Sequence, residues 1–188
     1  MGKGNHLLGE IEILKEETIL SSPYARVWHD DVVFPSGAKG KYLRVTCGSG
    51  VSVGVLPITE DGRAVLIRNY RHGIRDWCVE VPKGGVEPGE NPEEAARREL
   101  LEETGYAAGS LQFVGLYAEC PGIFSGKMHC YIARDCRRQG EPRAEETEAI
   151  SEILTAEPRE LLPQAGTESD LVTELLVMKY LMNEERQT

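Results

Sequence analysis

The sequence has no long apolar run. No stretch approaches the roughly 18 consecutive apolar residues of a transmembrane helix, and the N-terminal segment lacks the apolar core of a secretory signal peptide. Cysteine is also sparse: there are five residues and no Cys-x-x-Cys pair, which argues against a disulfide framework and against a zinc knuckle. These absences predict a cytoplasmic protein with free thiols and no membrane partner.

Positive charge is in short supply as well. The chain has 21 Lys and Arg against 31 Asp and Glu, a formal net charge of −10, which argues against binding the backbone of long nucleic acids. Small phosphate-bearing ligands stay open, because a bound metal offsets local negative charge. The 188 residues, 40% apolar and 28% charged, are typical of one globular domain with or without a small accessory piece.

Strand patterns fill the first part of the chain. Apolar and polar residues alternate in three runs that end at turns rich in Pro, Ser and Gly, namely 10–20, 25–34 and 41–47. A sheet of that size is marginal on its own. We therefore expect an N-terminal β subdomain, residues 1–48, ahead of a main domain, residues 49–188.

The main domain has further strand patterns and two longer helices. Strands are predicted at 51–58, 64–71, 77–81, 111–119, 127–133 and 149–155, with a hairpin turn at 60–62. The polar segment 134–147 is predicted to be a long loop, and a short helix is expected at 158–162. A final helix capped by Ser169-Asp170 is predicted to point Leu171, Leu175, Met178 and either Leu181 or Met182 inward. The fold class is α+β, with helices around a mixed sheet.

The most informative stretch is 84–106. Asn91 before Pro92, with Glu94 at the third helical position, predicts a capped helix start, and Gly105 predicts its end. On that helix Glu99, Glu102 and Glu103 share one stripe, because residues three and four apart are neighbours on a helix surface.

Two interpretations of the acidic stripe are open from the residues alone. It is either a solvated face with ion pairs between neighbouring turns, or a set of oxygen ligands for a metal. Carboxylates favour Mg²⁺ or Mn²⁺ over zinc, which prefers His and Cys.

The stretch resembles the Nudix box, Gly-x5-Glu-x7-Arg-Glu-U-x-Glu-Glu-x-Gly-U, where U is apolar. The only departure is an aromatic residue at the last position. The matching residues are Gly84, Glu90, Arg98, Glu99, Leu100, Glu102, Glu103, Gly105 and Tyr106. The resemblance implies a Nudix α/β/α sandwich with a divalent metal held by the acids of the helix.

The same resemblance implies a role for each position of the box. Glu99 and Glu103 are expected to bind the metal directly, Glu102 to hold a further ion or its waters, and the Lys83 carbonyl to add an oxygen. Glu90 and Arg98 are expected to form the structural pair of the motif, with Gly84 and Gly105 supplying its turns.

The flanks of the box resemble the ADP-ribose pyrophosphatase branch of the family. The similar segments are Asn69-Tyr70-Arg71, residues 80–85, Pro121 and the acidic segment 146–148. Glu146 or Glu148 is the expected general base. Residues expected to bind substrate are Arg71, Glu80, Arg44, Pro121 and Phe124.

The resemblance implies Mg²⁺-dependent (or Mn²⁺-dependent) hydrolysis of a nucleoside diphosphate linked to a group X, with ADP-ribose as the leading substrate. NADH, dinucleoside polyphosphates and nucleotide sugars are alternative substrates. From another class, a non-catalytic nucleotide-sensing module is the alternative, and the retained acids argue against it. A homodimer built through the N-terminal sheet is also implied.

Overall fold

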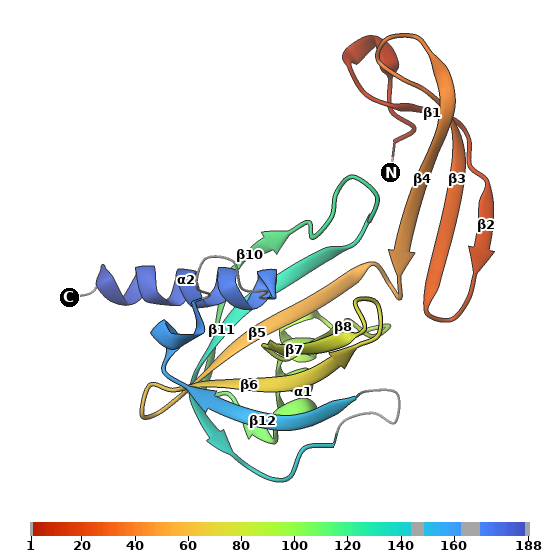
Figure 1. Cartoon of the computed structure of the whole chain (residues 1–188). Helices are drawn as coiled ribbons and strands as arrows, with labels where there is room; N and C mark the ends of the chain where they lie inside the picture. The colour runs from red at the N-terminus through yellow and green to blue at the C-terminus, as the bar shows by residue number, and fades with distance from the viewer. Residues whose placement is uncertain (1, 144–148, 163–169, 187–188) are drawn as a thin grey trace. The chain divides into compact units, whose positions relative to one another are not determined.

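The chain forms two compact units in a computed structural model that describes residues 2–143, 149–162 and 170–186. The first unit comprises Met1–Val51 and Ala118–Lys127, and the second comprises Ser52–Tyr117 and Met128–Thr188. The sequence suggested a boundary near residue 48, and it gave no sign that residues 118–127 group with the N-terminal segment. Figure 1 shows the elements of both units.

The first unit is an antiparallel sheet built around one long strand. That strand, β3 (Ala25–Val33), pairs with β1 (Glu12–Lys15), β2 (Thr18–Ser21) and β4 (Lys39–Cys47). A short 3-10 helix, η1 (His6–Leu8), precedes the sheet. The strand pattern expected over 10–20 is interrupted, since Glu16 and Glu17 lie between β1 and β2.

The segment 120–126 attaches to β4 in the first unit. The Tyr42 hydroxyl donates to the Gly122 carbonyl at 2.6 Å, and the Val45 N–H donates to the Ile123 carbonyl at 2.9 Å. Val45 also forms a parallel bridge with Phe124. A segment about 80 residues further along the chain therefore extends the edge of this sheet.

The second unit has a sheet with the strand order β10-β11-β5-β6-β12, to which β7, β8 and β9 add as partners of β6, β5 and β11. Its elements are β5 (Val51–Thr59), β6 (Ala64–Arg71), β7 (Asp76–Glu80), β8 (Lys83–Gly85), α1 (Pro92–Thr104), β9 (Tyr106–Ala107), β10 (Ser110–Tyr117), β11 (Lys127–Arg138), β12 (Ile150–Ala156), η2 (Pro158–Leu161) and α2 (Leu171–Glu185). Of the helices that the structure describes, none is both long and apolar enough to cross a membrane.

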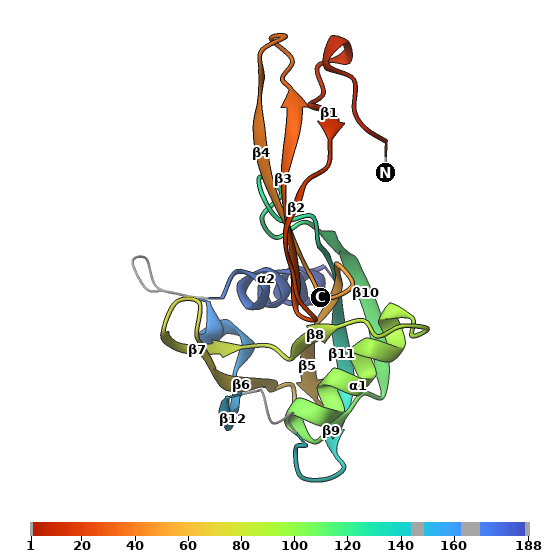
Figure 2. The ribbon, with the colours of Figure 1, turned by 90° about the vertical axis from the view of Figure 1, so that its right-hand side faces the viewer.

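The two α-helices lie on opposite faces of this sheet (Figure 2). Alternation along β5 and β11 explains the arrangement, because successive side chains of a strand point to opposite faces. One set packs with α1 and includes Val53, Val55, Tyr131 and Ala133. The other set packs with α2 and includes Leu56, Ile58, Cys130 and Ile132.

The prediction of a loop from residue 134 is wrong for its first part. Strand β11 continues to Arg138, and its end pairs with β9, with Arg137 opposite Ala107. Asp135 has a φ of 53°, which interrupts the alternation of the strand. The regular apolar pattern ends there, although Cys136 beyond it is buried.

The predicted inward face of the last helix is also wrong for most of its residues, although Leu181 is partly buried against the core. Leu171 and Met178 are 69% and 47% exposed. The buried residues are Val172, Thr173, Leu176, Val177 and Tyr180. The predicted and the observed inner stripes of this helix are both apolar, so hydrophobic periodicity alone could not predict which one is buried. On the observed inner side, Thr173 accepts the Val81 N–H, and Leu176 and Val177 pack in the core.

Gly105 ends α1 in the left-handed region, with a φ of 74°, and a Cβ there would lie 2.3 Å from the Gly140 carbonyl oxygen. Gly62 has a similar φ of 82° but nothing within 4 Å of such a Cβ. We expect Gly62→Ala to cost about 1 kcal/mol of unfolding free energy through backbone strain alone. Gly105→Ala should cost about 1–3 kcal/mol more because of the clash. Equal losses for the two variants in urea denaturation would contradict this packing of the end of α1.

Candidate active site

Helix α1 begins and ends where its sequence predicts. The Asn91 side chain accepts hydrogen bonds from the backbone N–H groups of Glu93 and Glu94, each at 3.0 Å, and Glu94 accepts from the Asn91 N–H at 3.0 Å. This is a complete capping box, with Pro92 in the first turn. The predicted start is confirmed, and the face of the helix turned to the core is set by Ala95, Ala96 and Leu100, which pack there.

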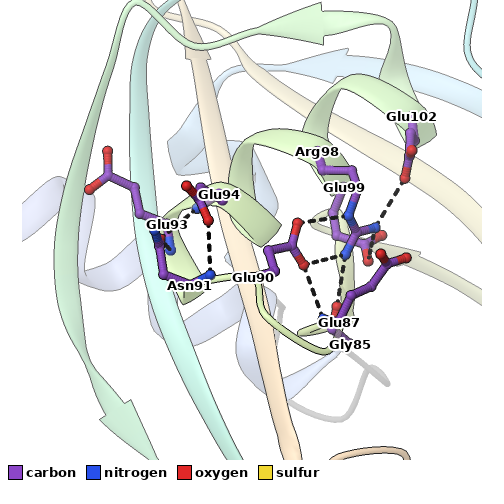
Figure 3. A network of polar contacts seen from close by, with 9 residues as sticks. All are labelled: Gly85, Glu87, Glu90, Asn91, Glu93, Glu94, Arg98, Glu99 and Glu102. Carbon is purple, nitrogen blue, oxygen red and sulfur yellow. Dashed lines mark hydrogen bonds and ion pairs between the residues drawn. The ribbon is translucent and has the colours of Figure 1, made fainter.

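Arg98 joins the acids of the box (Figure 3). Its Nε and one Nη donate to the two carboxylate oxygens of Glu90, at 2.9 and 3.0 Å, and that second nitrogen also donates to the Gly85 carbonyl at 2.9 Å. The other Nη donates to Glu99 at 2.8 Å and to Glu102 at 3.1 Å. All five N–H groups of the guanidinium are therefore used.

This network has a surplus of negative charge. Hydrogen bonds from Arg98 hold the pKa of the Glu90 carboxyl below its usual range, and Glu90 in turn raises the pKa of the guanidinium. One guanidinium brings a single positive charge, whereas Glu90, Glu99 and Glu102 bring three negative charges. These four groups together are thus suited to a further cation.

Glu99 and Glu103 both face the turn at Lys83-Gly84. They are 7% and 1% exposed. Glu103 accepts a hydrogen bond from the Lys83 backbone N–H at 3.0 Å. A Cβ on Gly84 would lie 1.9 Å from a carboxylate oxygen of Glu99, so only glycine leaves room for that carboxylate. The helix acids and the backbone of the turn are therefore close neighbours.

The donor chemistry of this region fits a hard divalent cation. No group of three or more His, Cys, Asp or Glu side chains is arranged as a metal centre in the described ranges. Glu99 and Glu102 instead accept from Arg98, and Glu103 accepts from Lys83. All the candidate metal ligands are oxygen atoms, and two of the carboxylates are buried. Such a set suits Mg²⁺ or Mn²⁺ rather than zinc.

A second charged cluster lies beside the first. Glu80 is 1% exposed and binds cations on both of its oxygens: Arg71 at 2.5 Å on one and the Lys83 ammonium at 2.9 Å on the other. Asn69 also donates to Glu80, at 3.2 Å. The side chain of Arg71 is 43% exposed, so it is only partly covered by the protein. Two residues predicted separately to bind substrate, Arg71 and Glu80, thus form an ion pair in which only the carboxylate is buried.

Lys83 extends this cluster to α2. Its ammonium lies 2.6 Å from Asp170, the N-cap of α2. Burial opposes the charged form of Asp170, but the Lys83 ammonium and hydrogen bonds from Thr173 outweigh it and hold the pKa of Asp170 below its usual value. The Lys83 side chain is therefore turned toward Glu80 and Asp170.

The other residues predicted to bind substrate are in the first unit or outside the described ranges. Arg44, Pro121 and Phe124 belong to the first unit. Arg44 donates to Asp30 at 2.7 Å, and its guanidinium lies 4.2 Å from the centre of the Trp28 ring. Glu146 and Glu148 lie outside the described residues, so their predicted role as general base is not addressed by the structure.

The sequence did not point to Asp170 or Thr173 as neighbours of this region. Asp170 was recognised only as a helix cap, and Thr173 carries no signal of its own. Lys83 and Asp170 are 87 residues apart, so only the tertiary fold brings them together. The one hint was Lys83 itself, a cation where the similar branch of the family commonly has Ala.

Gly84 and Gly85 form a matched pair for testing this geometry. Gly84→Ala should displace the Glu99 carboxylate and weaken the binding of Mn²⁺ by roughly tenfold or more. Gly85→Ala should leave Mn²⁺ binding within about twofold of the wild type, since a Cβ there meets nothing within 4 Å. Paramagnetic resonance of free Mn²⁺ measures both affinities, and similar affinities for the two variants would rule out the placement of Glu99.

Comparisons with known proteins identify the family. A family model described as the NUDIX domain matches residues 48–175. The chain is 30% identical over 145 residues to the ADP-ribose pyrophosphatase of Bacillus subtilis (strain 168), covering 77% of each chain. It is 36% identical over 123 residues to the ADP compounds hydrolase NudE of Escherichia coli (strain K12), covering 65% of this chain and 66% of the relative. It is 34% identical over 134 residues to the methanol dehydrogenase activator of Bacillus methanolicus, covering 71% and 69%.

A solved structure confirms the expected fold. The crystal structure of an ADP compounds hydrolase superposes with a TM-score of 0.77 at 28% identity, covering 95% of this chain and 97% of that one. The α/β/α sandwich with a separate antiparallel N-terminal sheet is therefore confirmed. The chain belongs to the Nudix family and is a hydrolase of that family.

Proposed function

We propose that this hydrolase splits the diphosphate bond of a nucleoside diphosphate linked to a second group, with ADP-ribose as the leading substrate. The products would be AMP and ribose 5-phosphate. The names of two relatives, an ADP-ribose pyrophosphatase and an ADP compounds hydrolase, support this substrate class. The observation that carries the proposal is the intact box, with Glu99 and Glu103 buried against the turn at Lys83-Gly84.

Mg²⁺, or Mn²⁺ in its place, is the proposed cofactor. Glu99, Glu103 and the Lys83 carbonyl would hold it, and Glu102 would hold a further ion or its waters. When bound, such an ion offsets the charge of the phosphate oxygens and lowers the pKa of a coordinated water. The chain itself contributes the oxygen ligands and keeps mutually repelling carboxylates in place through Arg98.

Arg71 is the proposed anchor for an anionic part of the substrate. Glu80 accepts one of its N–H groups, which fixes the orientation of the guanidinium, while the exposed part of the side chain keeps donors for phosphate or carboxylate oxygens. Arg98 has a different role, because all of its donors are used within the box. Arg44, Pro121 and Phe124 stay proposed substrate contacts, and Glu146 or Glu148 the proposed general base.

Two alternatives to this proposal, other substrates and a non-catalytic role, can be distinguished by experiment. NADH, dinucleoside polyphosphates and nucleotide sugars share the diphosphate bond and would be cleaved by the same chemistry. A non-catalytic nucleotide-binding module would have no need of the acids of the box, which this chain retains. A screen of these compounds with identification of the products ranks the substrates and tests for catalysis.

Glu103→Gln tests the catalytic proposal against a control on the same helix, Glu93→Gln. Wild-type protein should release AMP from ADP-ribose with Mg²⁺ and lose this activity with a chelator. Glu103→Gln should lower kcat/KM by roughly 100-fold or more, since loss of metal chemistry removes several kcal/mol of transition-state stabilisation. Glu93, whose side chain is 56% exposed and pairs with Arg97, should tolerate the change. Full activity of Glu103→Gln would refute the assignment of Glu103.

A homodimer is proposed through the first unit, as the resemblance implies. The first unit leaves many large apolar side chains exposed in the single chain, including Leu7, Leu8, Leu14, Ile19, Leu20 and Tyr24. Sedimentation at micromolar concentration should therefore give twice the chain mass of 20.8 kDa. A single-chain mass at every concentration would rule the dimer out.

A further inference from the structure

The backbone of residues 81–83, within the turn at residues 80–85, is held by three elements. From β5, the Val55 N–H donates to the Pro82 carbonyl at 3.0 Å. From α1, Glu103 accepts the Lys83 N–H at 3.0 Å. The third support comes from α2, which lies outside the box and has no place in its pattern. This turn contains the Lys83 carbonyl, the backbone oxygen proposed as a metal ligand.

Thr173 of α2 makes the contact with the turn. Its hydroxyl accepts the Val81 N–H at 2.9 Å and donates its own hydrogen to Asp170 at 2.7 Å. Val81 is 0% exposed and Thr173 is 6% exposed. A buried N–H needs a partner. Thr173 satisfies that need, and Asp170 fixes the direction of its hydroxyl.

Asp170 makes a second contact with the same turn. Its other carboxylate oxygen lies 2.6 Å from the ammonium of Lys83, whose side chain is only 12% exposed. The same ammonium lies 2.9 Å from Glu80, at the end of β7. The turn is therefore attached to the start of α2 on both sides of Pro82, at Val81 through Thr173 and at Lys83 through Asp170.

The backbone on either side of Pro82 connects the contact with α2 to the proposed metal ligands. Pro82 has no N–H. The Val81 N–H on one side of Pro82 donates to Thr173, and the Lys83 N–H on the other side donates to Glu103. Because Pro82 is rigid, a displacement of Val81 also displaces the Lys83 N–H. The position of the Lys83 carbonyl relative to the acids of α1 thus depends on a helix from the opposite face of the sheet.

We propose that Thr173 and Asp170 are positioning residues for the metal-holding turn, so that the start of α2 sets the affinity of the site for its divalent ion. The inference rests on the proposed metal role of the Lys83 carbonyl and of Glu103. It adds two residues that touch neither metal nor substrate. Outer partners of this kind typically change metal affinity by about 10–100-fold when they are removed.

Thr173→Val is the direct test, because it keeps the shape of the side chain and removes the hydroxyl. Thr59→Val is the matched control: the Thr59 hydroxyl also accepts a backbone N–H, that of Arg63 at 3.0 Å, but in the hairpin between β5 and β6. Binding of Mn²⁺ without substrate is measured by paramagnetic resonance, and exchange of the Val81 amide hydrogen is measured without metal.

We expect Thr173→Val to bind Mn²⁺ roughly tenfold more weakly and to exchange the Val81 amide faster. Thr173→Ser should restore both values, and Thr59→Val should change neither. Asp170→Asn, which keeps the size of the side chain but removes its charge, should weaken Mn²⁺ binding in the same direction. It supplies the test if Thr173→Val does not fold.

Two results overturn the inference, and they are distinguishable. Wild-type affinity for Mn²⁺ in both Thr173→Val and Asp170→Asn would overturn the positioning role and leave the proposed function standing. Absence of Mn²⁺ binding by the wild-type protein would overturn the proposed function together with the inference.

Discussion

The site depends on keeping several carboxylates close together, and Arg98 is the residue that makes this arrangement stable. Acids three and four positions apart on a helix repel one another by a few tenths of a kcal/mol per pair. Arg98 offsets this repulsion because one Nη donates to both Glu99 and Glu102. Its Nε and other Nη donate to Glu90 and to the Gly85 carbonyl. A lysine could not do so, because its ammonium lacks the planar five-donor geometry.

The fold holds this network from both sides of one sheet. Helix α1 lies on one face, with its start set by the Asn91 cap and its end set by Gly105. Helix α2 lies on the other face, where Leu176 and Val177 pack into the core. Both helices contact the backbone of residues 81–83, which includes the carbonyl proposed as a metal ligand.

Local signals in the sequence were sufficient for α1 and its network. The Asn91 cap, Pro92, Glu94 and Gly105 act within a few residues, so the start and end of the helix were predictable. The pairing of Glu90 with Arg98 followed from the family motif. The short strands β8 and β9 were missed, because two or three residues carry no periodicity.

Features that depend on tertiary contacts could not be predicted from the sequence. The continuation of β11 past Asp135 depends on a backbone with positive φ, which hides the alternation. The buried face of α2 depends on its contacts with the turn, and the ion pair of Lys83 with Asp170 joins distant parts of the chain. The acidic segment that contains Glu146 and Glu148 was predicted from resemblance alone, and its role stays a prediction.

The central claim is that oxygens from α1 and from the adjoining turn bind one divalent ion. Crystals of the wild-type protein grown with Mn²⁺ test it directly through the anomalous signal of the metal. The account predicts a peak at about 2.1 Å from carboxylate oxygens of Glu99 and Glu103 and from the Lys83 carbonyl oxygen. Manganese bound only elsewhere, with Glu99 still held by Arg98 and Glu103 by the Lys83 N–H, would contradict it.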